Sequence, residues 1–361
     1  MMRRLFLSLM FLLFCVPAMA ADVVLNPNHP QQHVVVPGDT LWDISGEFLM
    51  FPWNWPDIWY VNPQIENPHL IYPGDIISLV YRDGRPVLEL TRGPKTYKMS
   101  PEVREIVLEK AIPTIPLSAI KPFLSKPRVV GEETLANAPY IVSSADERLI
   151  SGAGDKVFAR GFTADDEGDH YSVFRGGKPY LDPETKEVLG YEAIYTAEAW
   201  VTTKGDPATV ELQHTTREVR IGDRLLPVID DDYEMNFIPR LPDEPQQGEI
   251  ISVFDGVTQV GQYQIVVINR GTREGIEVGH VLMVLAKGKA IEDTVTAERN
   301  VYVKLPDQFA GGAMVFKTFE KVSYVIIMKA NQAIHVGDRV QSDTDEYSDE
   351  INALFRGRGR R

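Results

Sequence analysis

The chain has almost no cysteine, and its only cysteine, Cys15, lies near the start. The surrounding sequence has a basic beginning (MMRR), an apolar run and an A-x-A pattern, which together predict a secretory signal peptide over residues 1–20. Phe14 stands where a lipidation signal would have a small residue. After cleavage the chain would have no disulfide, catalytic thiol or cysteine-bound metal. We therefore expect a periplasmic, cell-wall-associated protein without disulfides.

A second long apolar run is also absent, so we expect no transmembrane segment after cleavage of the signal peptide. The seven histidines form no H-E-x-x-H motif, and there is no G-x-S-x-G elbow. The acidic runs at residues 165–169 and 230–232 lack EF-hand spacing and are interpreted as solvated turns. We therefore expect no enzyme activity, no cofactor and no metal site. A catalytic carboxylate pair stays an open alternative, because sequence alone does not reveal one.

Positive charge is scarce in one region. The whole chain has 37 basic and 51 acidic residues, a net charge of −14. Residues 32–80 contain six acidic residues and no Lys or Arg. A surface of that sign repels phosphate groups, which argues against nucleic acid or anionic lipid as the ligand of this region.

Residues 33–79 carry a clear series of local signals. A β-branched strand at residues 33–36 is followed by a P-G-D turn and then by Thr40, which is positioned as a helix N-cap. A second short helix over residues 55–61 ends before proline, and a second P-G-D turn precedes a strand at residues 76–79. The sequence predicts a β-α-α-β unit whose first helix has an apolar face made of Leu41, Ile44 and Phe48.

The series V-x-P-G-D-T-L-W-x-I, then N-P, then a second P-G-D resembles the LysM domain, over about one seventh of the chain. The resemblance implies that residues 32–80 bind N-acetylglucosamine-containing glycan, such as peptidoglycan, in a groove between two loops. The implied binding residues are Gly38, Asp39, Thr40, Leu41, Asn67, Pro68, Leu70 and Ile71. These loops would combine hydrogen-bonding groups with apolar contact, as an uncharged sugar requires. In an alternative interpretation, Leu41 and Ile44 belong only to the core.

The sequence FPWNWP at residues 51–56 departs from the LysM pattern. It is interpreted as an extra loop that either covers the groove or contacts a partner.

Residues 82–130 have the opposite charge, with ten basic and five acidic residues, and contain seven prolines. A helix is predicted from Ser100-Pro101 to Lys110, and Ser118 can cap a further turn. The segment can be a semi-rigid basic linker. Alternatively it docks on the next domain, because its apolar residues are too many for a free linker: Ile106, Val107, Ile112, Ile115, Leu117, Ile120, Phe123 and Leu124.

The remaining sequence is β-rich, and three short alignments indicate an internal repeat. They place residues 190–198 on 312–320, residues 221–225 on 336–340, and residues 157–161 on 267–271. The shared Gly-Asp turns are interpreted as structural rather than catalytic. The predicted fold class is α+β, with a small β-α-α-β LysM domain followed by two related β-rich repeats, residues 131–240 and 245–341. Residues 342–361 are predicted to be a disordered tail.

This layout resembles the type IV pilus secretin-associated proteins, which join LysM to a carboxy-terminal region similar to that of the flagellar assembly protein T. The resemblance implies a non-enzymatic anchor that ties the outer-membrane secretin of the pilus machine to peptidoglycan. The alternatives are a wall anchor for flagellar or division components and a LysM-targeted cell-wall hydrolase.

Overall fold

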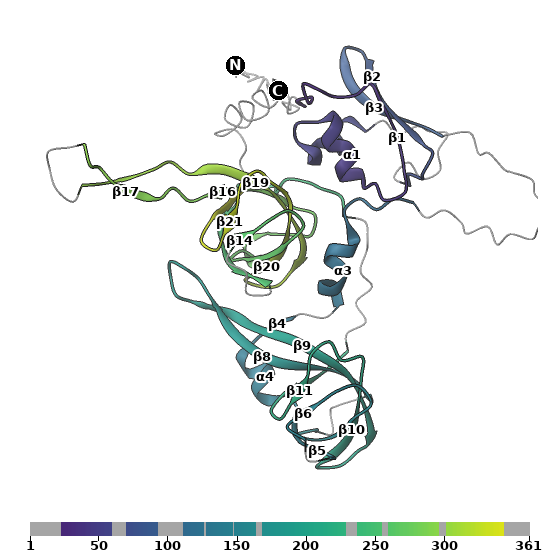
Figure 1. Ribbon diagram of the computed structural model, residues 1–361, viewed down its shortest axis with the longest axis vertical. Helices are drawn as coiled ribbons and strands as arrows, with labels where there is room; N and C mark the ends of the chain where they lie inside the picture. Colours follow the sequence, from purple (N-terminus) through teal and green to yellow (C-terminus); the bar gives the residue numbers. More distant parts are fainter. Residues whose placement is uncertain are drawn as a thin grey trace, which may run out of the picture.

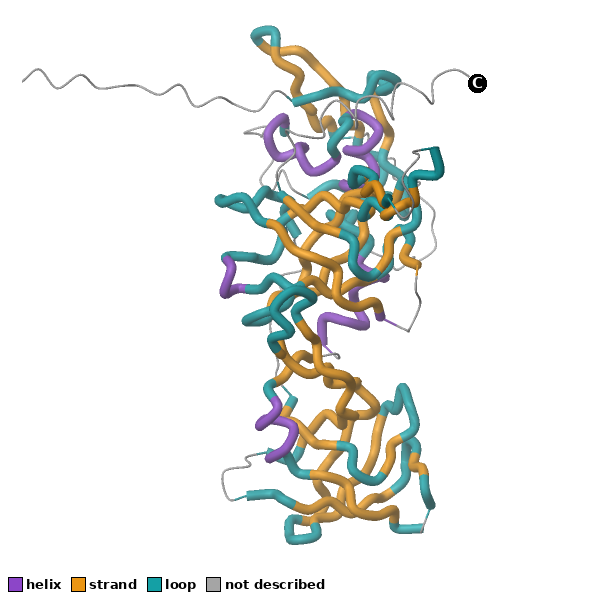
Figure 2. The backbone as a smooth tube through the Cα atoms, turned by 90° about the vertical axis from the view of Figure 1, so that its left-hand side faces the viewer, coloured by secondary structure: helices purple, strands orange, loops and turns teal. Residues whose placement is uncertain are grey.

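A computed structural model describes residues 23–59, 70–92, 111–125, 128–146, 148–163, 168–228, 237–254, 259–295 and 301–342. Three units lie in a row: an N-terminal unit, a central β-barrel formed by the C-terminal part of the chain, and a second β-unit at the far end (Figures 1 and 2). The predicted signal peptide, the predicted helix from Ser100 to Lys110, the predicted tail after residue 342, and the binding residues Asn67 and Pro68 lie outside the described residues. Ser342, the first residue of the predicted disordered tail, is instead buried, and its amide donates to the Gln246 carbonyl oxygen at 3.0 Å.

The N-terminal unit is a three-stranded antiparallel sheet of order β1-β2-β3 with short helices on one side. Its elements are β1 (Gln32–Val34), α1 (Leu41–Phe48), the 3-10 helix η1 (Pro52–Asn54), α2 (Trp55–Ile58), β2 (Ile76–Arg82) and β3 (Arg85–Thr91). Strand β3 was not predicted, because residues 82–130 were interpreted as a linker or docking segment. Its signal is Asp83-Gly84, which has positive φ at both positions (51° and 79°), as a tight hairpin turn requires. The unit therefore extends to residue 91.

The connection to the β-rich region contains α3 (Leu117–Ser125), β4 (Arg128–Val130) and α4 (Glu132–Asn137). Ile115 and Ile120 are fully buried in this part of the chain. Ile112 packs on the core of the N-terminal unit, while Ile115 and Ile120 pack on the barrel of the second β-unit rather than only on the next domain along the chain, which the docking alternative expects.

In the described residues, the first β-unit contains eight strands, β5 to β12. They are β5 (Tyr140–Ser144), β6 (Ile150–Ser151), β7 (Lys156–Arg160), β8 (His170–Leu181), β9 (Val188–Thr203), β10 (Ala208–Gln213), β11 (Val219–Arg220) and β12 (Arg224–Pro227). Since β10 pairs with both β7 and β9, six of these strands close into a ring of order β12-β5-β7-β10-β9-β8. The two short strands β6 and β11 pair with each other.

The second β-unit is a closed barrel of order β22-β13-β15-β20-β19-β16. Its strands are β13 (Gln247–Val253), β14 (Gln259–Val260), β15 (Ile265–Ile268), β16 (Val281–Ala286), β17 (Ala290–Glu292), β18 (Tyr302–Lys304), β19 (Gln308–Thr318), β20 (Ser323–Ala330), β21 (Ile334–His335) and β22 (Arg339–Gln341), with the 3-10 helix η3 (Thr272–Glu274) after β15. The short strands β14 and β21 pair with each other, and β17 pairs with β18.

The two β-units share one strand order and one set of pairings. When β5 is placed on β13, β7 on β15, β8 on β16, β9 on β19, β10 on β20 and β12 on β22, every pairing in one ring has its counterpart in the other. The pair β6–β11 corresponds to β14–β21. Two register shifts also lie at equivalent places. The shift at Ile141/Ser143 in β5 corresponds to the one at Ile250/Ser252 in β13, and the shift at Val173/Phe174 in β8 corresponds to the one at Val284/Leu285 in β16.

The strand pairings correct two of the three sequence alignments. With Arg224 placed on Arg339, the paired strands bring Ala197 into the position of Gly311. Residues 190–198 therefore correspond to 304–312, not to 312–320. Likewise Ala159 corresponds to Ile268, so residues 157–161 are displaced by one position. The alternation of strand residues repeats every two positions, so short β segments can be aligned in several registers.

The third alignment, of residues 221–225 on 336–340, coincides with two turns of the same geometry. Gly222 and Gly337 have φ of 92° and 93°, which favours glycine. The carboxylates of Asp223 and Asp338 accept hydrogen bonds from the amide three residues earlier, at 2.9 and 2.7 Å. Both turns thus have the structural role that the sequence predicts for them.

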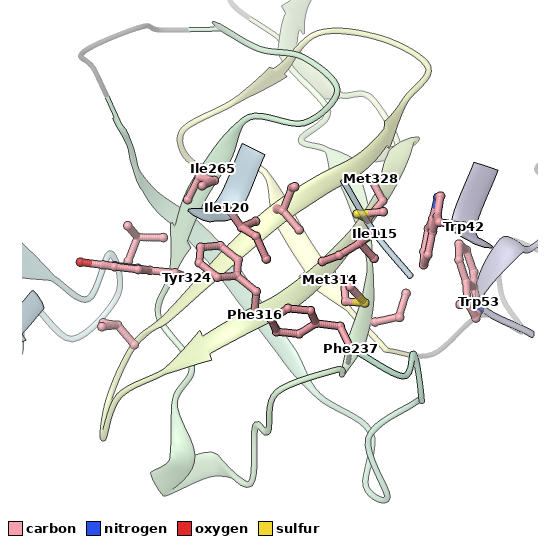
Figure 3. Close-up of a cluster of buried hydrophobic side chains, with 14 of the residues drawn as sticks. Trp42, Trp53, Ile115, Ile120, Phe237, Ile265, Met314, Phe316, Tyr324 and Met328 are labelled. Carbon is pink, nitrogen blue, oxygen red and sulfur yellow. The ribbon is translucent and has the colours of Figure 1, made fainter. Parts of the chain in front are cut away.

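The outer face of the central barrel is the main contact surface of the molecule. Strands β15, β19 and β20 contribute buried residues such as Met314, Phe316 and Tyr324 to it. Against this face pack Trp42 and Trp53 of the N-terminal unit, Ile115 and Ile120 of the connection, and Phe237 (Figure 3). Tyr180 and Leu189 of the first β-unit belong to the same cluster.

Candidate functional site

The two predicted binding loops are held by local hydrogen bonds. Thr40 caps α1 as predicted, with its hydroxyl oxygen accepting from the Asp43 amide at 3.1 Å. The Asp39 carboxylate accepts from the Val36 amide at 2.9 Å, closing a turn in which Gly38 has a φ of 101°. The loop before β2 is held by Arg92, which directly follows β3. The Arg92 guanidinium group donates to the Leu70 carbonyl oxygen at 3.0 Å and pairs with the Asp75 carboxylate.

Several of the predicted binding side chains are buried. Leu41 is 4% exposed and Ile71 is 1% exposed, and both belong to the core of the N-terminal unit together with Ile44. Thr40 is also buried, Leu70 is half-buried and Gly38 is exposed. The alternative interpretation, in which Leu41 and Ile44 are core residues, agrees with this packing. Within the described residues of these loops, Thr40, Leu41 and Ile71 can therefore offer a ligand mainly their backbone groups.

The backbone groups of the two loops are bound by another segment of the same chain. The Leu41 amide donates to the Pro113 carbonyl oxygen at 3.0 Å, and the Trp42 amide donates to the Thr114 carbonyl oxygen at 3.0 Å. On the opposite side, the Ile112 amide donates to the Ile71 carbonyl oxygen at 2.8 Å. The segment of residues 111–115 therefore lies in the predicted groove and binds both of its loops.

This segment was not predicted to contact the groove. The free amides at the start of α1 have no partner within the helix and attract an acceptor, which here is the peptide backbone of residues 113 and 114. Ile112 packs against the core of the N-terminal unit, and Ile115 packs against the central barrel. The sequence signal was the alternation of isoleucine and proline, which favours an extended segment with apolar anchors.

Phe51 and Trp53 of the aromatic stretch at residues 51–56 pack against the central barrel, whereas Trp55 packs in the core of the N-terminal unit. The rings of Phe51 and Trp53 are in tilted contact with centroids 5.2 Å apart, and a Cβ on Gly312 of β19 would lie 3.1 Å from the Trp53 ring. On the same side, the Tyr263 hydroxyl donates to the Asp43 carboxylate at 2.8 Å. The contact of Phe51 and Trp53 with another unit of the same chain is a third outcome, different from both sequence interpretations.

His33 connects the first loop with helix α1. Its two ring nitrogens lie 2.9 Å from carboxylate oxygens of Asp39 and Glu47. Partial burial lowers the pKa of His33, but the hydrogen bonds and charges of Asp39 and Glu47 outweigh burial and raise this pKa above its usual 6.5. A neutral imidazole has one N–H and can donate to only one carboxylate, so both contacts require the protonated ring.

We expect the stability of the N-terminal unit to depend on this protonation. Because the folded-state pKa of His33 is raised, its contribution is complete below the ordinary value of 6.5 and is lost as the pH rises through the raised value. The melting temperature should therefore fall as the pH rises above the ordinary pKa of 6.5, and the fall should be smaller in a His33→Gln variant. Thermal unfolding followed by tryptophan fluorescence measures the melting temperature of each protein at each pH. An equal dependence of the melting temperature on pH in the two proteins would contradict this role of His33.

The described residues hold no group of three or more His, Cys, Asp or Glu side chains arranged to bind a metal. Over the same part of the chain, the helices are too short or too polar to cross a membrane.

The N-terminal unit consists of one short sheet and short helices, and residues 112–114 are hydrogen-bonded to the start of its first helix and to Ile71. Residues 33–80 match the family model of the LysM domain, and this part of the chain is a LysM domain. Domains of this family bind peptidoglycan- and chitin-type glycans at cell walls. A comparison with curated proteins finds no match for the chain.

Proposed function

We propose that this protein is a non-enzymatic peptidoglycan anchor of the periplasm, whose LysM groove binds glycan when residues 111–115 leave it. The observation that carries the proposal is the chemistry of the groove, in which two amides and one carbonyl hold a peptide. The acetamido group of N-acetylglucosamine presents the same C=O acceptor and N–H donor as a peptide unit. A glycan chain can therefore take the place of residues 112–114.

Residues 111–115 and the glycan compete for the groove, and this competition sets the apparent affinity for glycan. If the groove is open in only a fraction of molecules, the dissociation constant for glycan is raised by the reciprocal of that fraction. The occupied groove thus supports modest affinity for short glycans. Several copies held on one envelope structure would still be retained on intact wall, because linked weak sites act at raised effective concentration.

The intact chain should pellet with insoluble peptidoglycan and should remain bound at high salt. Residues 32–80 have no Lys or Arg, so the contact does not rely on charge pairs that salt would screen. The same incubation should release no soluble muropeptides above a buffer control. An Asp39→Ala/Thr40→Ala variant should bind less, and circular dichroism must show that it is folded. Loss of most binding at high salt, or muropeptide release that one substitution abolishes, would reject the proposal.

The partner that we propose for the rest of the chain is the outer-membrane secretin of the type IV pilus machine. This choice rests on the resemblance of the whole layout to secretin-associated proteins. It is also supported by the arrangement of the units, because the first β-unit lies at the end of the row farthest from LysM (Figure 1). One end of the molecule can therefore hold the wall while the other end holds a ring in the membrane.

A tag on the intact chain should co-purify the secretin from detergent-solubilised envelopes. The Asp39→Ala/Thr40→Ala variant should retain the secretin equally well, because its substitutions lie in the LysM loop. Mass spectrometry of the purified complexes identifies the partner. If the secretin is absent and flagellar or division proteins are present instead, the chain anchors a different machine.

A further inference from the structure

Each β-unit carries a two-stranded arm that projects from the same place in its ring. In the first unit the arm is the outer part of β8 and β9, residues 176–191. In the second unit it is the ribbon of β17 and β18. Both arms begin just after the shared register shift, at Val173/Phe174 and at Val284/Leu285. The two arms are therefore equivalent parts of the two units.

The arm of the first unit is covered on its edge and at its tip. Strand β4 pairs with the outer edge of β9, with Val129 opposite Glu192. Tyr180 and Leu189 are buried against the central barrel. The Glu187 carboxylate lies 2.7 Å from Lys321 and 3.1 Å from Arg273 of that barrel. A third strand and a neighbouring barrel thus stabilise this arm.

The ribbon of β17 and β18 projects away from the rest of the described chain, and its residues are exposed (Figure 1). Ile291 pairs directly with Val303, and the Leu305 amide donates to the Lys289 carbonyl oxygen at 3.0 Å. Alternation places Ile291, Val303 and Leu305 on one face, where they are 47%, 46% and 40% exposed. A lone two-stranded ribbon is marginally stable in water, and such an apolar face gains by being covered.

Among the described strands, β18 pairs only with β17, and its other edge has the geometry to accept another strand. The bonds from Leu305 to Lys289 and from Asp293 to Val301 show that the odd-numbered residues use their backbone groups inside the ribbon. The backbone groups of Tyr302 and Lys304 therefore face outward. In the first unit, the corresponding edge of β9 is the one that β4 occupies.

We propose that β18 pairs with β18 of a second copy of this chain, in an antiparallel arrangement with a two-fold axis at Val303. In this register Tyr302 faces Lys304 of the second copy, so the outward backbone groups of both strands meet and no like charges are opposed. The face opposite Tyr302 and Lys304 then carries a continuous apolar row, made of Ile291 and Val303 from each copy. A two-fold contact requires such self-complementarity, and the joined ribbons form a four-stranded sheet.

Sedimentation velocity of the chain from residue 21 onward tests this pairing over a range of protein concentrations. The intact chain should approach twice the mass of one copy as its concentration rises. Lys304→Pro removes an outward N–H without breaking a bond inside the ribbon, and Val303→Lys brings two like charges together. Either substitution should return the mass to that of one copy at every concentration.

Val188→Lys is a matched control, because it puts the same charge at an exposed position of the other arm. This variant should form dimers like the intact chain. The proposal is overturned if the intact chain keeps the mass of one copy at its highest soluble concentration. It is equally overturned if the Lys304→Pro and Val303→Lys variants, with unchanged circular dichroism, still form the dimer.

Discussion

Replacing Ile112 and Ile115 by aspartate should increase binding to peptidoglycan about tenfold or more, because the groove is then vacant in most molecules. Ile112 packs on the LysM core and Ile115 is fully buried against the central barrel. A carboxylate at either position would have to be desolvated without a partner, so the segment should leave the groove. The Leu41 and Trp42 amides would then be free to bind the glycan. Co-sedimentation with purified peptidoglycan measures the change.

The matched control for this variant is Ile150→Asp/Ile221→Asp, which makes the same chemical change at two exposed isoleucines. A fragment of residues 23–92, which keeps β3 but lacks the segment, opens the groove in a second way. Both the Ile112→Asp/Ile115→Asp variant and the fragment should bind more tightly than the intact chain. If both are folded and neither binds more tightly, the groove is not the glycan site.

Trp53→Ala should separate the LysM domain from the central barrel while leaving the domain folded. The Trp53 side chain is only 7% exposed, and it lies between Phe51, Trp42 and the barrel. Truncation of a buried tryptophan costs about 3–5 kcal/mol. The LysM core itself is built from other residues, including Phe48, Trp55 and Leu88. The loss should therefore fall on the contact between the units.

Differential scanning calorimetry tests this expectation. The variant should show a LysM transition at lower temperature, separate from that of the β-units, because the cooperativity of the units depends on the shared cluster. Trp200→Ala removes a half-exposed tryptophan from the first β-unit and should leave the LysM transition in place. An unchanged LysM transition in Trp53→Ala would mean that the contact contributes little to stability.

These two predictions concern two contacts of the same domain. The LysM helices contact the barrel through Trp42 and Trp53, and the groove holds the connection that leads to α3. Ile115 and Ile120 of that connection pack on the same face of the barrel as Trp53. Release of residues 111–115 from the groove therefore also disturbs the contact with the barrel, and glycan binding is expected to loosen the LysM domain from its neighbour.

The LysM domain could be predicted because its signals are local. The turn at Gly38, the cap at Thr40 and the apolar spacing of α1 are each decided by residues a few positions apart. The same holds for the two Gly-Asp turns before β12 and β22, whose side chains bind the backbone three residues away. Strand β3 was missed, although Asp83-Gly84 gave the hairpin signal, because the basic and proline-rich composition of the segment outweighed it in the prediction.

The sequence by itself determined the LysM pattern, the β-rich character of the rest and the Gly-Asp turns. Only the tertiary structure decided which segment occupies the groove, because backbone groups of residues 41 and 113 meet through a contact that no side-chain pattern records. It also decided the register of the two β-units, since an apolar alternation of period two fits several alignments. The role of the central barrel emerged in the same way. Its outer face contacts residues that lie as far apart in the sequence as Trp42 and Met328. A cluster of residues so distant in sequence depends on how whole units pack together.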